Sequence, residues 1–274
     1  MLFRPALLAL ASVLAPVSVA VPAAAAASAP PSVQAPARAM AATTRATSID
    51  SPWIAHGPGW AGYVAKGTRY RYVQAQFRVT KLNCHKTPGT QADQAQMADW
   101  VGLDGWTDKT VEQDGIGGFC TDGVPSYSAW WETYPQPPHY IFNMHAGDDI
   151  MAVVFYSKGK YKLELEDYTS GRGFSLVERC GAHKCANSTA EVITEDPGKA
   201  DSKTNADFPL ADCGTTEFWN IKVTSQSGLK GNFDTNPWED TQVTMTDKHN
   251  TTMMATGSLF AGGTAFQTFW KREY

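Results

Sequence analysis

Apolar and polar residues alternate with a period of two in several stretches of the chain. The clearest are residues 72–79 (YVQAQFRV) and 160–168 (KYKLELEDY), where apolar side chains recur at every second position. Residues 150–156 (IMAVVFY) form a continuous apolar run of strand length, and residues 218–224 (FWNIKVT) resemble another strand. A period of two places alternate side chains on opposite faces of a β-strand. We therefore predict a strand in each of these four segments.

Clusters of Gly, Pro, Asn and Asp separate the predicted strands at short intervals, and no segment combines helical periodicity with a cap. Short strands with frequent turn signals are typical of an antiparallel sandwich or barrel. The chain also contains nine Trp, several of them beside polar residues. A sandwich with one sheet bent around a cleft would place such residues on its concave face, where ligands bind.

The amino-terminal region has a different composition from the rest of the chain. Residues 1–27 contain one early Arg, an apolar run broken by Pro16 and Pro22, and a small-residue end, which is the pattern of a secretory signal peptide. Residues 28–51 are rich in Ala, Pro, Ser and Thr, which favours a disordered leader or a short pro-segment. We predict that residues 52–274 form one exported, extracellular domain without a membrane span after signal removal.

Charge and metal-ligand spacing exclude several classes of function. The formal net charge is −4, and it becomes −5 without Arg4, the one charge of the predicted signal peptide. No basic stretch is present, so nucleic acid is not an expected partner. The six His are scattered and no CxxC pair occurs, so we expect neither a metal site nor a cofactor.

Five cysteines lie in a chain that is predicted to be exported, where disulfides are permitted. Cys180 and Cys185 close a short loop and are the first expected pair, and Cys84 with Cys120 is the second. An odd count leaves at least one thiol unpaired or in an intermolecular bond.

Three segments carry carboxylates beside aromatic residues. They are residues 99–106 (DWVGLDGW), 127–135 (YSAWWETYP) and 190–196 (AEVITED). If each is a strand, alternation aligns Trp100 with Asp104, aligns Trp130 with Glu132 and Tyr134, and aligns Glu191 with Glu195. For any one segment taken alone, the alternative interpretation is that its carboxylates lie on a solvent-exposed face and have no functional role.

The chain resembles the glutamic peptidases, or eqolisins, as a bacterial-type or divergent member. Six blocks occur in the family's order and span most of residues 59–224. These blocks are GWAGYV (59–64), WVGLDG (100–105), EQDG (112–115), YSAWWETYP (127–135), AEVITED (190–196) and FPLADCGTTEF (208–218). The resemblance implies a lectin-like, concanavalin A-like β-sandwich of two antiparallel sheets, one of them bent to form a concave cleft.

The resemblance also implies the residues of the site. Gln113 and Glu195 correspond to the catalytic pair. The residues that would line the substrate cleft are Trp60, Trp100, Asp104, Trp130, Glu132 and Tyr134. The implied activity is hydrolysis of polypeptides at acidic pH by an activated water, without a metal or a covalent intermediate, in a monomeric secreted enzyme.

Two positions depart from the family pattern. Val192 replaces a Trp, and alternation directs that position away from Glu195, so the change is expected to affect packing more than chemistry. Gly117 replaces an Asp four residues after Gln113, which would remove a hydrogen bond behind that amide and reduce activity or alter its pH dependence.

Two other classes of function also fit an aromatic cleft with carboxylates. A jelly-roll glycoside hydrolase could use Glu132 and Glu195 as its pair of carboxyl groups. A non-catalytic lectin-like module could keep the aromatic residues alone. Gln113 discriminates among these classes, since the peptidase mechanism needs its amide and a glycosidase has no necessary use for it.

Overall fold

The described part of the chain consists of strands and the turns between them. The computed structural model describes residues 59–91, 93–180, 185–197, 209–247 and 249–273. Its regular elements in these ranges are sixteen β-strands. The predicted signal peptide and leader lie outside the described residues. No helix in the described ranges is long and apolar enough to cross a membrane.

Seven strands form the first sheet, in the order β13-β1-β10-β3-β4-β5-β6 with antiparallel pairing throughout. Their bounds are β1 (Trp60–Lys66), β3 (Ala95–Leu103), β4 (Val111–Thr121), β5 (Val124–Tyr134), β6 (His139–Asn143), β10 (Ala190–Glu195) and β13 (Glu239–Val243). Strands that are distant in sequence, such as β1, β10 and β3, therefore become direct neighbours.

The second sheet has nine strands, in the order β14-β15-β16-β11-β2-β7-β8-β9, with β12 paired to β11. Their bounds are β2 (Tyr70–Arg78), β7 (Asp149–Ser157), β8 (Lys160–Asp167), β9 (Arg172–Arg179), β11 (Thr215–Ser225), β12 (Lys230–Gly231), β14 (Met245–Thr246), β15 (Thr252–Thr256) and β16 (Phe266–Trp270). The four segments predicted as strands lie in β2, β7, β8 and β11.

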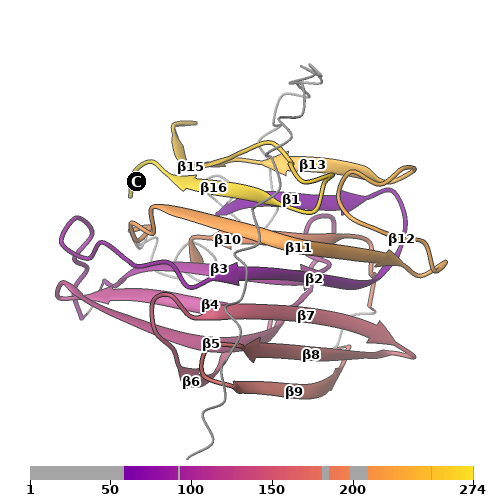
Figure 1. Cartoon of the computed structure of the whole chain (residues 1–274), viewed down its shortest axis with the longest axis horizontal. Helices are drawn as coiled ribbons and strands as arrows, with labels where there is room; N and C mark the ends of the chain where they lie inside the picture. The colour runs from indigo at the N-terminus through magenta and orange to yellow at the C-terminus, as the bar shows by residue number, and fades with distance from the viewer. Residues whose placement is uncertain (1–58, 92, 181–184, 198–208, 248, 274) are drawn as a thin grey trace, which may run out of the picture. The chain divides into compact units, whose positions relative to one another are not determined.

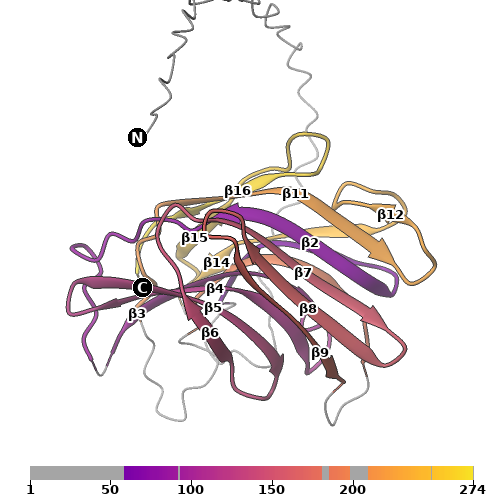
Figure 2. The same cartoon turned by 60° about the horizontal axis from the view of Figure 1, so that its bottom comes forward.

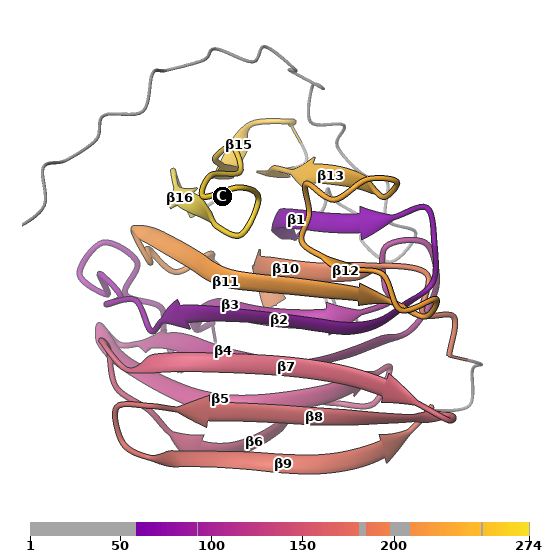
Figure 3. The same ribbon diagram turned by 45° about the vertical axis from the view of Figure 1, so that its right-hand side comes forward.

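The two sheets pack face to face as a β-sandwich, which confirms the predicted fold class. In Figure 1 the strands of both sheets run in similar directions. Figure 2 shows the sheets as two layers, and Figure 3 shows β2, β7, β8 and β9 in front of β3, β4, β5 and β6. Side chains of alternate positions fill the space between the layers: Val73, Ala75 and Phe77 from the second sheet are fully buried with Val101 and Ile116 from the first.

The outer face of the first sheet carries a second apolar cluster. Its buried members are Val64, Ala98, Trp100, Val111, Trp130, Ile193 and Val243. The partly buried Trp60, Trp106 and Tyr134 pack against them. A sheet whose outer face faced water would be polar there, so this apolar face indicates a surface built to hold a ligand.

Both expected disulfides are present. Cys84 pairs with Cys120, which ties the segment before β3 to the end of β4, and Cys180 pairs with Cys185. Cys213 is the remaining cysteine, and it is buried as a free thiol.

Candidate active site

Strand register sets three rows of side chains across the first sheet, each with one residue from β1, β10, β3, β4 and β5. The Glu195 row is Trp60, Glu195, Ala98, Gly117 and Ser128. The Trp100 row is Gly62, Ile193, Trp100, Gly115 and Trp130. The Gln113 row is Val64, Glu191, Gly102, Gln113 and Glu132. Because the members of a row lie side by side, five separate segments contribute to one surface.

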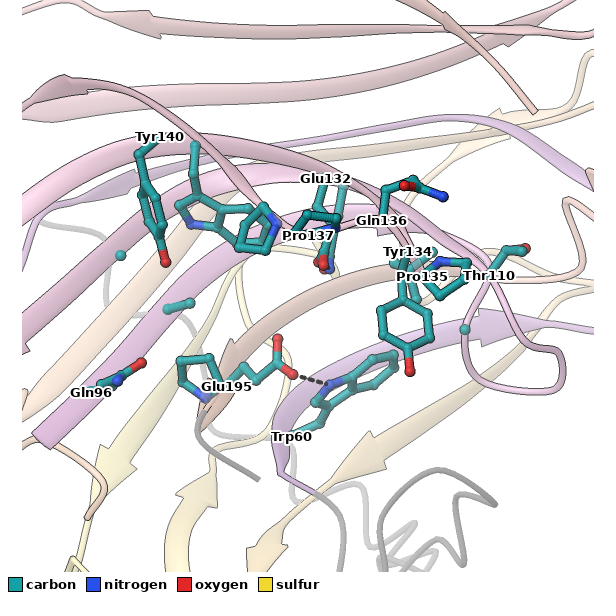
Figure 4. A pocket seen from close by; sticks show the side chains of 18 of the residues that line it. Trp60, Gln96, Thr110, Glu132, Tyr134, Pro135, Gln136, Pro137, Tyr140 and Glu195 are labelled. Atoms are coloured by element: carbon teal, nitrogen blue, oxygen red, sulfur yellow. Dashed lines mark hydrogen bonds between the residues drawn. The ribbon is translucent and has the colours of Figure 1, made fainter. Parts of the chain in front are cut away.

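Glu195 is held by two indole donors. Trp60 Nε1 donates to Oε1 at 3.1 Å, and Trp100 Nε1 donates to Oε2 at 2.8 Å. The two indole rings meet edge to face, with centroids 5.0 Å apart. Figure 4 shows the Trp60 bond at the floor of the site. The carboxyl group therefore has a fixed orientation before any substrate binds.

The environment of Glu195 opposes its ionisation. Burial, followed by the charge of Glu132, raises the pKa of Glu195 to about 7, and the hydrogen bonds from Trp60 and Trp100 act in the opposite direction. A carboxylate with a raised pKa is a stronger base than an ordinary one, although less of it is ionised in acid.

Gln113 is held by Glu132, its neighbour in the row. Gln113 Nε2 donates to Glu132 Oε2 at 2.6 Å. One N–H of the amide nitrogen is used in this contact, which leaves its second N–H available. Gln113 Oε1 is buried and has no partner among the described residues. The amide thus retains one donor and one acceptor.

Glycines make room for the large rings between these two groups. A Cβ at Gly102 would lie 2.7 Å from Cζ3 of Trp100 and 3.3 Å from Cβ of Gln113. A Cβ at Gly115 would lie 2.7 Å from both Cα and Cβ of Trp100. Any side chain at either position would displace Trp100, and with it the donor to Glu195.

These side chains surround a cleft of about 530 Å³. Of the residues proposed from the sequence, six line it: Trp60, Gln113, Trp130, Glu132, Tyr134 and Glu195. In Figure 4, Glu195 and Glu132 face each other across its middle, Tyr140 and Gln96 lie at one end, and Thr110 and Tyr134 lie at the other. Trp100 is fully buried beneath the cleft and reaches the site through its bond to Glu195.

The structure does not bring Asp104 to the cleft. β3 ends at Leu103, and Asp104 has a φ of 73°, so the alternation that aligned it with Trp100 stops one residue earlier. Its carboxylate is fully buried and accepts hydrogen bonds from the backbone N–H groups of Asn187 and Ser188, both at 2.6 Å. Burial raises the pKa of Asp104 to about 7. Its observed role is to join the loop after β3 to the segment before β10.

The two departures from the family pattern lie in different environments. Val192 is fully buried in the core between the sheets, on the face of β10 opposite to Glu195. Gly117 lines the cleft. The Trp-to-Val change at position 192 therefore affects the packing of the core, and the Asp-to-Gly change at position 117 affects the candidate site.

Sequence reasoning missed the cleft wall formed by Phe119, Tyr140 and the Pro135–Pro138 loop. Phe119 lies six residues after Gln113 on β4, so alternation along that strand could have identified it. Tyr140 pairs with Trp130 through the β5–β6 register, which no local pattern reveals.

No group of three or more His, Cys, Asp or Glu side chains within the described ranges could hold a metal ion. The fold and the site together define a β-sandwich protein with a carboxyl–amide pair in a cleft on one sheet.

Comparison with known proteins identifies the family. Residues 58–265 match the model of the peptidase A4 family. Aspergillopepsin-2 of Aspergillus niger is 27% identical over 197 residues, which cover 65% of this chain and 68% of that protein. The chain therefore belongs to the peptidase A4 family, the glutamic peptidases, and it is a hydrolase of peptide bonds. This confirms the resemblance and removes the support for a glycosidase or a lectin-like module.

Solved structures share the fold. Scytalido-glutamic peptidase, solved with a transition state analog inhibitor, has a TM-score of 0.66 at 22% identity, and the match covers 79% of this chain and 100% of that one. Aspergilloglutamic peptidase from Aspergillus niger has a TM-score of 0.55 at 23% identity, with coverage of 65% and 99%.

Proposed function

We propose that this chain is a secreted, acid-acting endopeptidase in which Glu195 and Gln113 activate a water molecule against the peptide bond. The observation that carries the proposal is that both groups line one cleft and that each is oriented by its own partner. Indole N–H groups hold Glu195 and the carboxyl group of Glu132 holds Gln113. Secretion is supported by the signal-like residues 1–27 and by the two disulfides.

In the first step, ionised Glu195 takes a proton from water as the water oxygen attacks the substrate carbonyl carbon. The acceptor Oε1 of Gln113 orients the water. The second N–H of Gln113 Nε2 donates to the oxygen that becomes negative in the tetrahedral intermediate.

In the second step, protonated Glu195 donates its proton to the leaving nitrogen, and the C–N bond breaks. The carboxyl product and the amine product then leave with Glu195 ionised again. Since burial raises the pKa of Glu195 to about 7, its carboxyl group stays protonated between the two steps under acidic conditions.

We expect a bell-shaped dependence of the rate on pH, with an acid limb set by the ionisation of Glu195 and an alkaline limb set by loss of the folded state. On the acid side, the ionised fraction of Glu195 falls about tenfold for each pH unit below its pKa of about 7. On the alkaline side, buried carboxyl groups ionise and the folded state is lost. The measurement is hydrolysis of an unfolded protein by the mature domain between about pH 2 and about pH 8, with circular dichroism of the same samples.

The expected result is that the alkaline limb of the rate follows the loss of folded protein, and that a chelator has no effect. The Glu195→Gln variant, purified in parallel, controls for a contaminating peptidase. A rate that still rises at pH values where Glu195 and the buried carboxyl groups are fully ionised would contradict the proposal. A rate that requires an added metal would also contradict it.

Replacing Trp100 with Phe is expected to lower kcat/KM about 10–100-fold, because one hydrogen bond to a charged group contributes about 1.5–3 kcal/mol. Loss of a donor that favours the ionised form also raises the pKa of Glu195 further, so the acid limb of the rate profile moves to higher pH.

The matched control is Trp130→Phe, which makes the same change in size at the other Trp of the Trp100 row. Trp130 Nε1 has no partner among the described residues, so the acid limb is expected to stay in place. An equal displacement of that limb in both variants would show that Trp100 acts through packing alone.

A further inference from the structure

The floor of the cleft is shallow immediately beside Glu195. In the Glu195 row the next two positions are Ala98 and Gly117, which carry one methyl group and no side chain. Paired residues on neighbouring strands lie about 5 Å apart, so Gly117 lies about 10 Å from Glu195 across the sheet. Substrate atoms on this side of the reacting bond can therefore approach the sheet closely at Ala98, while the space above Gly117 accommodates a neighbouring ring.

Aromatic rings stand around this floor. An added Cβ at Gly117 would lie 3.0 Å from Cζ and 3.1 Å from Cε2 of Phe119, so the Phe119 ring lies over the glycine. Phe119 meets Tyr140 edge to face, with centroids 5.7 Å apart. Tyr140 is 55% exposed although it is large and apolar. Trp130 completes the wall, and its Cδ1 atom would lie 3.7 Å from the same added Cβ.

Charge is distributed unevenly along the cleft. The residues that line this end are Gln96, Met97, Ala98, Gly117, Phe119 and Tyr140, and none is charged. In Figure 4, Thr110 lies at the end of the cleft opposite to Gln96 and Tyr140. The charged residues Asp108 and Lys109 directly precede Thr110 and also line the cleft. An uncharged, aromatic wall with exposed rings favours apolar surface and disfavours an unpaired charge.

We infer that Ala98, Gly117, Phe119, Trp130 and Tyr140 form a subsite for a bulky apolar side chain of the substrate next to the cleaved bond, and that Gly117 determines this specificity. This inference rests on the proposed function, because it assumes that the ligand of the cleft is a polypeptide. A side chain at position 117 would displace the Phe119 ring, whose Cζ atom would lie 3.0 Å from the added Cβ, and a carboxylate there would place a charge against the aromatic wall.

The test begins with the cleavage sites of the wild-type domain in an unfolded protein, mapped by mass spectrometry. Phe, Tyr, Trp, Leu or Met is expected to be enriched at one position beside the cleaved bond. Peptides that differ only there, carrying Phe, Leu, Ala or Lys, then give kcat/KM ratios. The expected ratio of Phe to Ala is about 10–200-fold.

Gly117→Asp is expected to lower the Phe-to-Ala ratio at least about tenfold and to raise the relative rate for Lys, because a carboxylate pairs with its ammonium group. Phe119→Ala, which leaves the backbone at Gly117 unchanged, is expected to lower the same ratio. Gln136→Ala, at the opposite end of the cleft, is expected to leave it unchanged. A ratio within one variant is insensitive to a general loss of activity.

A binding measurement separates this inference from the peptidase mechanism. The affinities of the Phe and Ala peptides for the Glu195→Gln variant are measured by calorimetry, with and without Gly117→Asp. Preferential binding of the Phe peptide without any wild-type cleavage would support the subsite and overturn the mechanism. Cleavage without preference at either flanking position, or a ratio that survives both Gly117→Asp and Phe119→Ala, would overturn the subsite.

Discussion

Replacing Glu195 with Gln is expected to lower kcat for peptide hydrolysis by at least about 10⁴-fold. General acid–base groups contribute about 10²–10⁴-fold each, and in the proposed mechanism one carboxyl group performs both proton transfers. The amide of Gln has nearly the same shape, but it neither accepts the proton of water at its nitrogen nor returns one to the leaving group. Binding of the peptide should change much less than kcat, since the aromatic walls remain.

The loss can be distinguished from unfolding. Burial raises the pKa of Glu195 to about 7, so ionisation of this group disfavours the folded state and a neutral Gln does not. The variant should therefore remain folded through acidic and neutral pH, as circular dichroism would show. Glu166→Gln makes the same chemical change at an exposed position of β8, and it should keep the wild-type rate. A Glu195→Gln variant that cleaves at a rate close to wild type would exclude Glu195 as the base.

Much of the fold followed from local patterns. The alternation in residues 72–79 and 160–168 identified strands because each of these strands buries one face in the core. Register is different, because it depends on which distant strands pair. The rows that bring Trp60 beside Glu195, and Gln113 beside Glu132, became visible only in the three-dimensional structure.

The outcome for the candidate site differs from residue to residue for the same reason. Trp130, Glu132 and Tyr134 share a face of one continuous strand, and alternation placed them together correctly. Asp104 does not lie on the face predicted for it, because its left-handed backbone conformation ends the alternation after Leu103. A sequence pattern extends only as far as the strand that produces it.

Several carboxyl groups lie in the interior, and no sequence pattern identified them as buried. Asp99 is fully buried beside Trp100 in sequence, and it accepts hydrogen bonds from Thr194 at 2.6 Å and Thr216 at 3.2 Å. Burial raises the pKa of Asp99 to about 7. Burial, followed by the charge of Asp104, raises the pKa of Glu112 to about 8. These groups are therefore neutral inside the folded domain under acidic conditions.

The folded domain is expected to lose stability as pH rises from about 4 to about 8. In the unfolded chain Asp and Glu ionise near pH 4, whereas in the folded protein the pKa is about 7 for Asp99 and Asp104 and about 8 for Glu112. Between these values the folded state binds more protons, so raising the pH favours unfolding. The stabilisation is complete below about pH 4 and is lost as the pH passes through these folded-state pKa values.

Asp99→Asn should reveal the size of this effect, because the Asn oxygen can still accept from Thr194 while no ionisation remains. A pKa raised from about 4 to about 7 corresponds to a loss of about 4 kcal/mol once the group ionises in both states. That is a large part of the roughly 5–15 kcal/mol that stabilises a typical domain. At about pH 7 the variant should melt about 10 °C above wild type, given about 2–4 °C per kcal/mol for a domain of this size.

Thermal unfolding followed by circular dichroism between about pH 3 and about pH 8 measures both expectations. Wild type and the exposed control Glu166→Gln should show parallel declines in Tm as the pH rises, and Asp99→Asn should decline less steeply. A wild-type Tm that is flat or rises over this range, or an Asp99→Asn curve parallel to wild type, would show that the interior carboxyl groups do not govern stability. If the decline is observed, the alkaline limit of peptidase activity is a property of the sandwich interior, and substitutions such as Asp99→Asn should extend activity to higher pH without altering the cleft.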